Sequence, residues 1–269
     1  MFDTFNNRVV LRATLEMQTV LSVGSRISLE PVGTDLPVMK GPDGLPFIPG
    51  SSIKGAVRVL TERILRSLPN GEEIGLWACD PFADPCVDRN QARIWLQDEA
   101  TEHLVWDEAC TACRIFGSPW LASRVSFKDA YLENPEDLPV VTQIRDGVGI
   151  DRDLGAARQG IKYDFEVVVP GARFGIEILT ENLNDWELGL LLSVLRFWEE
   201  SQLPLGGKVT RGPGWGKLKD LHLERVDRAN LLKYLTGGQP AQDSPEKYLQ
   251  AFRDYLSQHL NRGGGMTHA

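Results

Sequence analysis

Apolar residues occupy every odd-numbered position from Val9 to Met17, and most of the positions between them are polar. This alternation is typical of a β-strand that buries one side. From Ser51 to Leu68 the apolar residues recur every three or four positions instead, which predicts an amphipathic helix that Pro69-Asn-Gly ends. The chain is therefore expected to begin with a strand, followed by a helix.

The same pattern continues in the second half of the chain. Residues Phe165 to Leu179 contain two apolar strand-like runs joined at Pro170-Gly171, which predicts a hairpin. Asn184 stands three residues before Glu187, a spacing that resembles a capping box at the start of an apolar helix. A further strand is predicted from Leu218 to Leu223. This order of elements predicts an α+β fold.

Beyond Asp227 the pattern predicts two short helices separated by Gly237-Gly-Gln-Pro-Ala, and the tail from Gly263 is expected to be flexible. At 269 residues, with 42% hydrophobic residues, the chain suits one elaborated domain. We assign that domain to residues 1–227 and a helical C-terminal extension to residues 228–269.

No apolar run approaches the ~20 residues that a membrane span needs, and the segment Met1–Arg8 lacks the features of a signal peptide. A cytoplasmic location without membrane contact is therefore expected. The formal net charge of −8 is concentrated between Asn70 and Ala109, which hold ten acidic and two basic residues. This acidic segment is expected to face away from nucleic acid or toward a protein partner.

Two segments have the composition of a phosphate-binding surface. In Gly44-Leu-Pro-Phe-Ile-Pro-Gly-Ser-Ser-Ile-Lys-Gly55, Gly50 can approach a ligand closely, and Ser51 or Ser52 can cap the helix that follows. Lys54 and Arg58 then share one helix face. The spacing is not that of a nucleoside-triphosphate loop, and a plain helix entry also explains these residues.

The second such segment, Leu203 to Lys219, is rich in glycine and holds four basic residues and no acidic one. Its composition suits phosphate contact, although a charge cluster is also compatible with a solvated face. A tight loop that leads into the last strand is the alternative reading of its glycines.

Four cysteines form a separate group with the spacings C-x6-C and C-x2-C. Thiolates suit a structural Zn²⁺ ion, which would hold the acidic segment together. His103 is a possible substitute for one cysteine. Reduced cysteines packed as small hydrophobes, or a redox Cys-x-x-Cys pair, are the alternatives. The predicted metal ligands are Cys79, Cys86, Cys110 and Cys113.

Several segments in order resemble the RAMP-superfamily backbone subunits of type III CRISPR effector complexes, the Csm and Cmr assemblies. They are the Gly44–Gly55 turn, Cys110-Thr-Ala-Cys113-Arg-Ile-Phe-Gly117 with Ser123-Arg-Val-Ser-Phe-Lys-Asp-Ala130, Gly149-Ile-Asp-Arg152, and Leu205-Gly-Gly-Lys-Val-Thr-Arg-Gly-Pro-Gly-Trp-Gly216. The resemblance implies a ferredoxin-like, RNA-recognition-type core with an inserted zinc-binding segment (about 70–113) and a protruding thumb hairpin (about 141–163).

The resemblance also implies partners and RNA-contacting residues. The partners would be a guide CRISPR RNA, a target RNA, and other RAMP subunits in a head-to-tail stack. Ile150 and Leu154 of the thumb would wedge into the guide–target duplex. The residues expected to contact RNA are Ser51, Ser52, Lys54, Arg58, Arg145, Arg152, Arg158, Lys162, Lys208 and Arg211.

The resemblance places the family's cutting aspartate at Asp35, in Gly33-Thr-Asp-Leu-Pro-Val38. A carboxylate there can bind Mg²⁺ or another divalent cation, or orient the ribose 2′-hydroxyl for attack on the adjacent phosphate, so that RNA is cut and DNA is not. Without the resemblance, an aspartate before Leu-Pro reads as a solvated turn residue.

One departure from the family pattern concerns catalysis. Several related subunits have a histidine in the loop after the first strand, where this chain has Leu21-Ser-Val-Gly24, and serine cannot carry a proton near neutral pH. Either metal or backbone geometry replaces that histidine, or the chain is an inert guide-binding scaffold that recruits partner proteins. A stand-alone ribonuclease for guide precursors is less favoured, because no His/Tyr/Lys constellation is present.

Overall fold

The computed structural model describes residues 3–24 and 34–263, apart from the side chains of 157–160 and 261–263. Its main sheet is antiparallel and confirms the α+β class. In spatial order the five strands of this sheet are β3 (Val125–Phe127), β7 (Arg173–Glu181), β1 (Asn7–Met17), β8 (Gly216–Asp227) and β9 (Ala241–Asp243). None of the described helices is long and apolar enough to cross a membrane.

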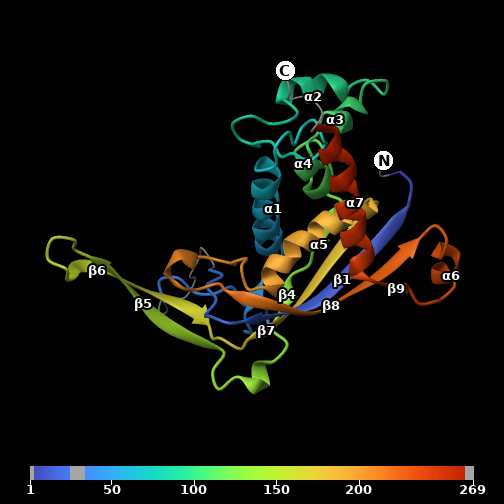
Figure 1. Cartoon of the computed structure of the whole chain (residues 1–269). Helices are drawn as coiled ribbons and strands as arrows, with labels where there is room; N and C mark the ends of the chain where they lie inside the picture. The colour runs from blue at the N-terminus through green and yellow to red at the C-terminus, as the bar shows by residue number, and fades with distance from the viewer. Residues whose placement is uncertain (1–2, 25–33, 264–269) are drawn as a thin grey trace.

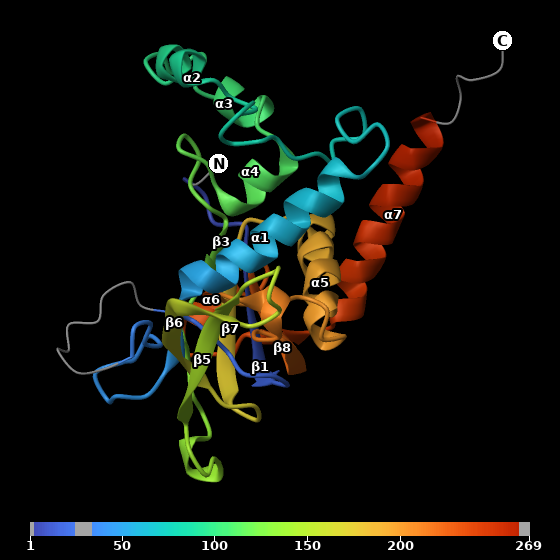
Figure 2. The same ribbon diagram turned by 90° about the vertical axis from the view of Figure 1, so that its left-hand side faces the viewer.

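The long helices lie on one face of this sheet, as Figure 1 shows, and α5 and α7 run side by side in Figure 2. They are α1 (Gly50–Arg66), α5 (Asp185–Glu199) and α7 (Pro245–Gly263). The alternation of β1 is confirmed, because its odd-numbered residues from Val9 to Met17 are all buried beneath these helices. The remaining short elements are β2 (Phe47–Ile48), β4 (Ala130–Tyr131), η1 (Pro135–Asp137), η2 (Val209–Arg211) and α6 (Leu231–Leu235).

Ion pairs between neighbouring strands cover the opposite face of the sheet. Arg12 of β1 bonds to Glu177 of β7 (3.3 Å) and to Glu224 of β8 (2.5 Å), and Lys219 of β8 bonds to Glu16 of β1 (2.7 Å). Cross-strand pairs of opposite charge stabilise a solvated sheet surface. This face is therefore already neutralised by its own side chains.

A two-stranded hairpin, β5 (Thr142–Ile150) and β6 (Ala157–Val168), projects from one end of the sheet (Figure 1). The predicted hairpin at Pro170-Gly171 is wrong, because β6 pairs with β5 while β7 pairs with β1 and β3. The turn instead passes the chain from one sheet to the other, and Gly171 donates its N–H to Met17 O (2.7 Å). The two strands were located correctly, but their partners lie elsewhere in the sequence.

The cysteine-containing segment is an insert between α1 and β3. It contains α2 (Arg89–Trp95), α3 (Leu104–Asp107) and α4 (Thr111–Phe116). Trp106 of the insert lies against two guanidinium groups, those of Arg114 (5.2 Å) and Arg124 (4.9 Å). Arg124 is buried and forms an ion pair with Glu187 of α5. The predicted capping box of Asn184 and Glu187 is confirmed, so one carboxylate both caps α5 and anchors the insert.

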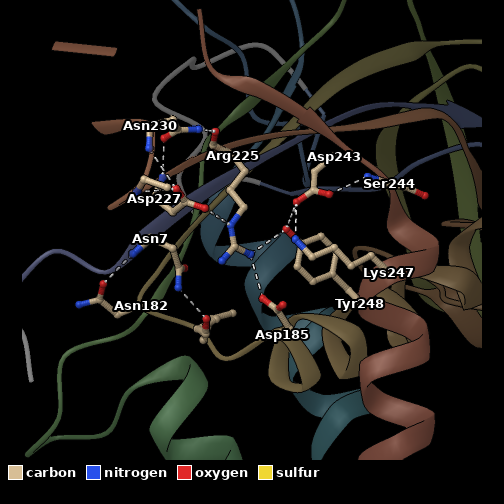
Figure 3. Close-up of polar contacts among 12 residues, drawn as sticks. Asn7, Asn182, Asp185, Arg225, Asp227, Asn230, Asp243, Ser244, Lys247 and Tyr248 are labelled. Atoms are coloured by element: carbon tan, nitrogen blue, oxygen red, sulfur yellow. Dashed lines mark hydrogen bonds and ion pairs between the residues drawn. The ribbon is translucent and has the colours of Figure 1, made fainter. Parts of the chain in front are cut away.

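Arg225 of β8 attaches the C-terminal extension to the core (Figure 3). Its guanidinium donates to Asp185 of α5 (2.8 Å) and to the hydroxyl of Tyr248 of α7 (3.0 Å), and that hydroxyl donates to Asp243 (2.5 Å). Tyr248 is fully buried, and its backbone contacts Gly189 of α5 so closely that a Cβ there would clash. The two predicted helices of the extension are confirmed, although α7 is long and the edge strand β9 was not predicted.

Candidate functional site

Asp35 lies beside the base of the hairpin. Leu36 forms a parallel β-bridge with Phe165 of β6, and the N–H of Glu166 donates to Leu36 O (2.9 Å). This bridge brings the exposed carboxylate of Asp35 to the edge of β6, where its Oδ2 accepts the N–H of Asp164 (3.0 Å). Within the described residues its Oδ1 accepts no hydrogen bond and is free for a ligand.

Glu166 fixes this loop from the hairpin side. Its Oε2 accepts the N–H of Val38 (3.1 Å), and its Oε1 pairs with Lys40 (2.8 Å). Burial opposes the charge of this carboxyl, but its hydrogen bonds, first among them the one from Lys40, hold the pKa of Glu166 below its ordinary value. Glu166 is therefore ionised at neutral pH and holds the Asp35 loop against β6.

Two aromatic and two basic side chains meet on the adjoining face of the hairpin base. The guanidinium of Arg211 donates to the hydroxyl of Tyr163 (2.6 Å), and Lys208 Nζ lies 4.4 Å from the ring centre of Phe165. Arg145 is directly opposite Phe165 in the hairpin register, so its side chain projects from the same face. Asp35 and the basic cluster of Arg145, Lys208 and Arg211 therefore converge on one short stretch of β6.

The glycine-rich loop before β8 reaches the hairpin because two glycines let it pack tightly. Gly206 (φ +82°) lies against Ser22 O and Gly214 (φ +97°) against Leu205 O, and a Cβ at either position would meet those oxygens at 2.5 and 2.3 Å. These two glycines are therefore needed for close packing against the protein's own backbone, and not for contact with a ligand. Gly212 (φ +108°) has open space around it and remains available to a ligand.

The start of α1 differs from the sequence prediction. Pro49 is the N-cap and makes no side-chain cap, so the predicted capping by Ser51 or Ser52 is wrong. The N–H of Gly50 instead binds Asp129 Oδ1 (2.7 Å), a residue 79 positions away in sequence. Gly50 is needed because Phe127 O occupies the place of a Cβ. Its close approach is to the protein backbone, not to a ligand.

A groove of about 560 Å³ runs between α1 and the glycine-rich loop. Ser52, Gly55 and Arg63 line its helix side, and Gly206 and Gly207 line its loop side. Ser51 is exposed on the same first turn of α1. The two segments with phosphate-binding composition therefore face each other across one groove.

Lys54 and Arg58 point to the other side of α1, toward the insert. Lys54 Nζ donates to Ser123 Oγ (3.1 Å). Arg58 bonds to Glu62 (2.7 Å) and to Gly117 O (3.0 Å) and approaches Cys113 Sγ (3.9 Å). The structure does not bring these two cations to the basic cluster at the hairpin base, and their contact with RNA stays a prediction.

The other hairpin residues that were predicted to contact RNA lie along the rest of the two strands and in the tip. Lys162 pairs with Asp146 across the two strands (3.2 Å). Arg152 lies in the exposed tip, and the side chain of Arg158 lies outside the described part of the structure. The predicted wedges Ile150 and Leu154 are both exposed, Leu154 by 81%. The tip of the hairpin therefore presents apolar side chains to water, and their contact with RNA stays a prediction.

The four cysteine thiols form one group. All four sulfur atoms lie within 4.8 Å of one another, and Cys79 Sγ is 3.7 Å from both Cys110 Sγ and Cys113 Sγ. A tetrahedral site with metal–sulfur bonds of ~2.3 Å has sulfur–sulfur edges of ~3.8 Å, so the group fits a metal ion, and 3.7 Å excludes a disulfide. His103 does not belong to this group and instead faces Asp107.

Sequence reasoning missed Tyr163, Phe165 and Glu166. Aromatic residues at i and i+2 near the end of a strand are a recognisable signal for a shared face. An acidic residue inside the apolar run Phe165-Glu-Val-Val-Val is a second signal, because a buried carboxylate needs partners. Both signals indicate a functional surface but do not identify the loop that it contacts.

Comparison with known proteins gives the family. A model of the RAMP superfamily matches residues 14–219. The chain is 28% identical over 233 residues to "CRISPR system Cms endoribonuclease Csm3" of Methanocaldococcus jannaschii, with 82% of each protein covered. A protein of the same name from Methanothermobacter thermautotrophicus is 26% identical over 245 residues, which cover 81% of this chain and 86% of that protein. The resemblance predicted from the motifs is thus confirmed, and the chain belongs to the RAMP superfamily.

Proposed function

We propose that this chain is a guide-RNA-binding backbone subunit of a type III CRISPR effector complex that cleaves guide-complementary RNA at Asp35. The observation that carries the proposal is the convergence of Asp35 with Arg145, Lys208 and Arg211 at the hairpin base. An exposed carboxylate beside several cations suits a phosphodiester substrate. The names of the Csm3 relatives support an endoribonuclease in such a complex.

We assign the core to the ferredoxin-like class. Its β1, α1, β3, β7, α5 and β8 follow the order β-α-β-β-α-β, within the proposed domain 1–227. RNA-recognition domains of this class use aromatic residues on the open sheet face. Here ion pairs centred on Arg12 occupy that face. We therefore place the guide in the groove between α1 and the glycine-rich loop, where Ser51 and Ser52 would contact its phosphates.

The proposed reaction uses the ribose 2′-oxygen as nucleophile. It attacks the adjacent phosphorus, and the bond to the 5′-oxygen breaks. The leaving 5′-oxygen takes a proton from water, and the products carry 2′,3′-cyclic phosphate and 5′-hydroxyl ends. Asp35 Oδ1 would orient the 2′-hydroxyl or receive its proton, and Lys208 and Arg211 would bind the phosphate. Mg²⁺ or a similar cation, when bound by Asp35, would supply positive charge to the phosphate oxygens.

The hairpin would act as the thumb. Its exposed tip carries Ile150 and Leu154. Apolar side chains that insert between bases unstack them, and Arg152 and Lys162 would hold the flanking phosphates. Each thumb would reach the next subunit of a head-to-tail stack. In that arrangement base pairing supplies the sequence specificity, and the protein recognises RNA by its shape and backbone.

For the cysteine group we propose structural Zn²⁺, since four thiolates leave no open coordination position. Arg58 lies beside the sulfur of Cys113, where its positive charge suits a thiolate. The ion would hold the insert in the fold and would take no part in cleavage.

A catalytically inert scaffold is the second candidate. The observation in its favour is that the described histidines, His103, His222 and His259, lie in the insert, β8 and α7, away from Asp35. Ser22, in the loop after β1, is buried and accepts the N–H of Gly207 through its carbonyl (2.7 Å). Such a scaffold would bind the guide and recruit partner proteins through its acidic insert.

Cleavage mapping in the reconstituted complex separates the two candidates. A labelled guide-complementary RNA is cut in the presence of Mg²⁺ by complexes with wild-type chain or with Asp35→Ala, and guide occupancy is measured in parallel. Loss of particular cuts with the guide still bound supports the nuclease. An unchanged pattern of cuts shows that the chain is a scaffold.

Glu166→Gln is expected to slow cleavage about 10-fold and leave guide affinity within about 2-fold, because a small displacement of a catalytic group is costly. Glutamine keeps an oxygen for the Val38 N–H but loses the ion pair with Lys40. Single-turnover cleavage and filter binding measure the two quantities. Glu133→Gln is the control, because Glu133 lies in the segment after β4, where its N–H donates to Arg173 O at the start of β7 (2.8 Å). Equal cleavage rates for the two variants would show that Glu166 does not position Asp35.

A further inference from the structure

A cleft of about 990 Å³ separates α1 from the insert and adjoins the proposed guide groove along α1. Its lining is mostly apolar and includes Cys79, Cys86 and Cys113 of the thiol group. Its aromatic residues are Phe82 at the rim, Phe116 of α4 and Trp120 in the loop after α4. A cleft of this size is larger than a nucleobase and suits a flat apolar ligand. The proposed reaction does not use it.

Cations lie on the helix side of this cleft. Lys54 is half-buried there, and no described carboxylate pairs with it, since its one partner is the Ser123 hydroxyl. Burial, together with the charge of Arg58, lowers the pKa of Lys54. A bound anion would offset both effects. The cleft therefore combines a mostly apolar interior with a cation that forms no ion pair with a described carboxylate.

The cleft and the guide groove meet across α1. Both are lined by Gly55 and Val59, and a Cβ added at Gly55 would meet nothing within 4 Å. Because Gly55 has no side chain, no side-chain atom separates the cleft from the guide groove at this position of α1. A strand whose phosphates follow the groove can place one phosphate at Lys54 and turn its base into the cleft.

The rim of the cleft presents an aromatic side chain to solvent. Phe82 is 97% exposed, and the turn that carries it is held by Asp80, whose Oδ1 accepts the N–H of Phe82 (2.9 Å) and of Ala83 (3.1 Å). Exposed aromatic rings on a fixed turn are suited to stacking with unpaired bases.

We propose that this cleft binds one unstacked base of the guide RNA, with the phosphate of that nucleotide on Lys54 and the base against Phe82 and Trp120. The inference rests on the proposed guide-binding function and adds a base site to it. Protein partners are a different class of occupant. The charge of Lys54, which pairs with no described carboxylate, favours an anionic nucleotide over a basic protein.

Photo-crosslinking in the reconstituted full-length complex tests the proposal. Guides with 4-thiouridine at successive single positions are irradiated, and the crosslinked peptides are identified. We expect one guide position per subunit to crosslink to a peptide that contains Phe82 or Trp120. Crosslinks confined to other surfaces, or a partner protein crosslinked in the cleft, would overturn the base site. Failure of the complex to retain any guide would instead overturn the proposed function.

Affinity measurements on single variants provide the second test. Phe82→Ala removes an exposed ring and should not impair folding, and it is expected to weaken guide binding about 5- to 100-fold. Ile94→Ala, an exposed apolar residue of the same insert outside the cleft lining, is the matched control and should bind as wild type. Equal affinities for the two variants, with the guide still bound, would overturn the base site and leave the proposed function intact.

Discussion

Asp35→Asn is expected to slow cleavage of guide-complementary RNA by about 10²- to 10⁴-fold while guide affinity stays unchanged. Asparagine has the shape of aspartate, and its side-chain oxygen can still accept the Asp164 N–H that positions the loop. The change therefore removes the negative charge and leaves the loop in place. Single-turnover cleavage at saturating guide measures the effect on the chemical step.

The matched control for this substitution lies in the same connecting segment. Asp43 is also an exposed aspartate whose Oδ1 accepts a backbone N–H, that of Leu45 (3.0 Å). Asp43→Asn is expected to cut at the wild-type rate, because Asp43 lies in a turn without the basic cluster. If both variants cut at the wild-type rate, Asp35 is not the catalytic carboxylate and the scaffold function is correct.

The sequence was informative wherever a local pattern determines the structure. The alternation in β1, the periodicity of α1 and the capping box of α5 were all readable because each depends on residues a few positions apart. The cysteine spacing indicated a shared site for the same reason, since each pair is local. The thiol group then formed as predicted.

The failures have a common physical origin in long-range pairing. β6 and β7 adjoin in sequence, but β7 pairs with the central strand β1 and with β3, and β6 pairs with β5 in the hairpin. The cap of α1 is supplied by Asp129, which no local rule could identify. Propensity and spacing do not determine which distant segment satisfies a given N–H.

The candidate site shows the same contrast between local patterns, which the sequence reveals, and long-range contacts, which it does not. Asp35, Lys208 and Arg211 were identified as separate motifs. Their common location at the base of β6 depends on contacts between distant parts of the sequence, such as the hydrogen bonds from Asp164 to Asp35 and from Arg211 to Tyr163. Glu166 was missed because its role depends on Val38 and Lys40, which only the fold brings to it. Individual chemical groups could be read from the sequence, but their arrangement could not.

Cys113→Ser is expected to abolish binding of the metal ion and to lower the thermal midpoint by roughly 10 °C, since a loss of several kcal/mol shifts the midpoint of a domain of this size by that amount. Cys113 is buried and contacts both Cys79 Sγ and the Arg58 guanidinium. Serine keeps the volume but is a poor ligand for Zn²⁺. Metal analysis of the purified chain and thermal unfolding measure the two effects.

The effect of the metal must be separated from the effect of packing, because Cys113 also belongs to the hydrophobic core. Ala112→Ser places a hydroxyl at a buried neighbouring position on α4 and leaves all four thiols in place, so it should retain the ion.

Limited proteolysis of the Cys113→Ser variant then shows which part of the chain has lost its structure. With the ion lost, cleavage should fall within residues 70–113 while the sheet stays protected, because β1, β7 and β8 pair independently of the insert. Full metal content in Cys113→Ser, or equal loss of stability in both variants, would show that the cysteines act only as small hydrophobic residues.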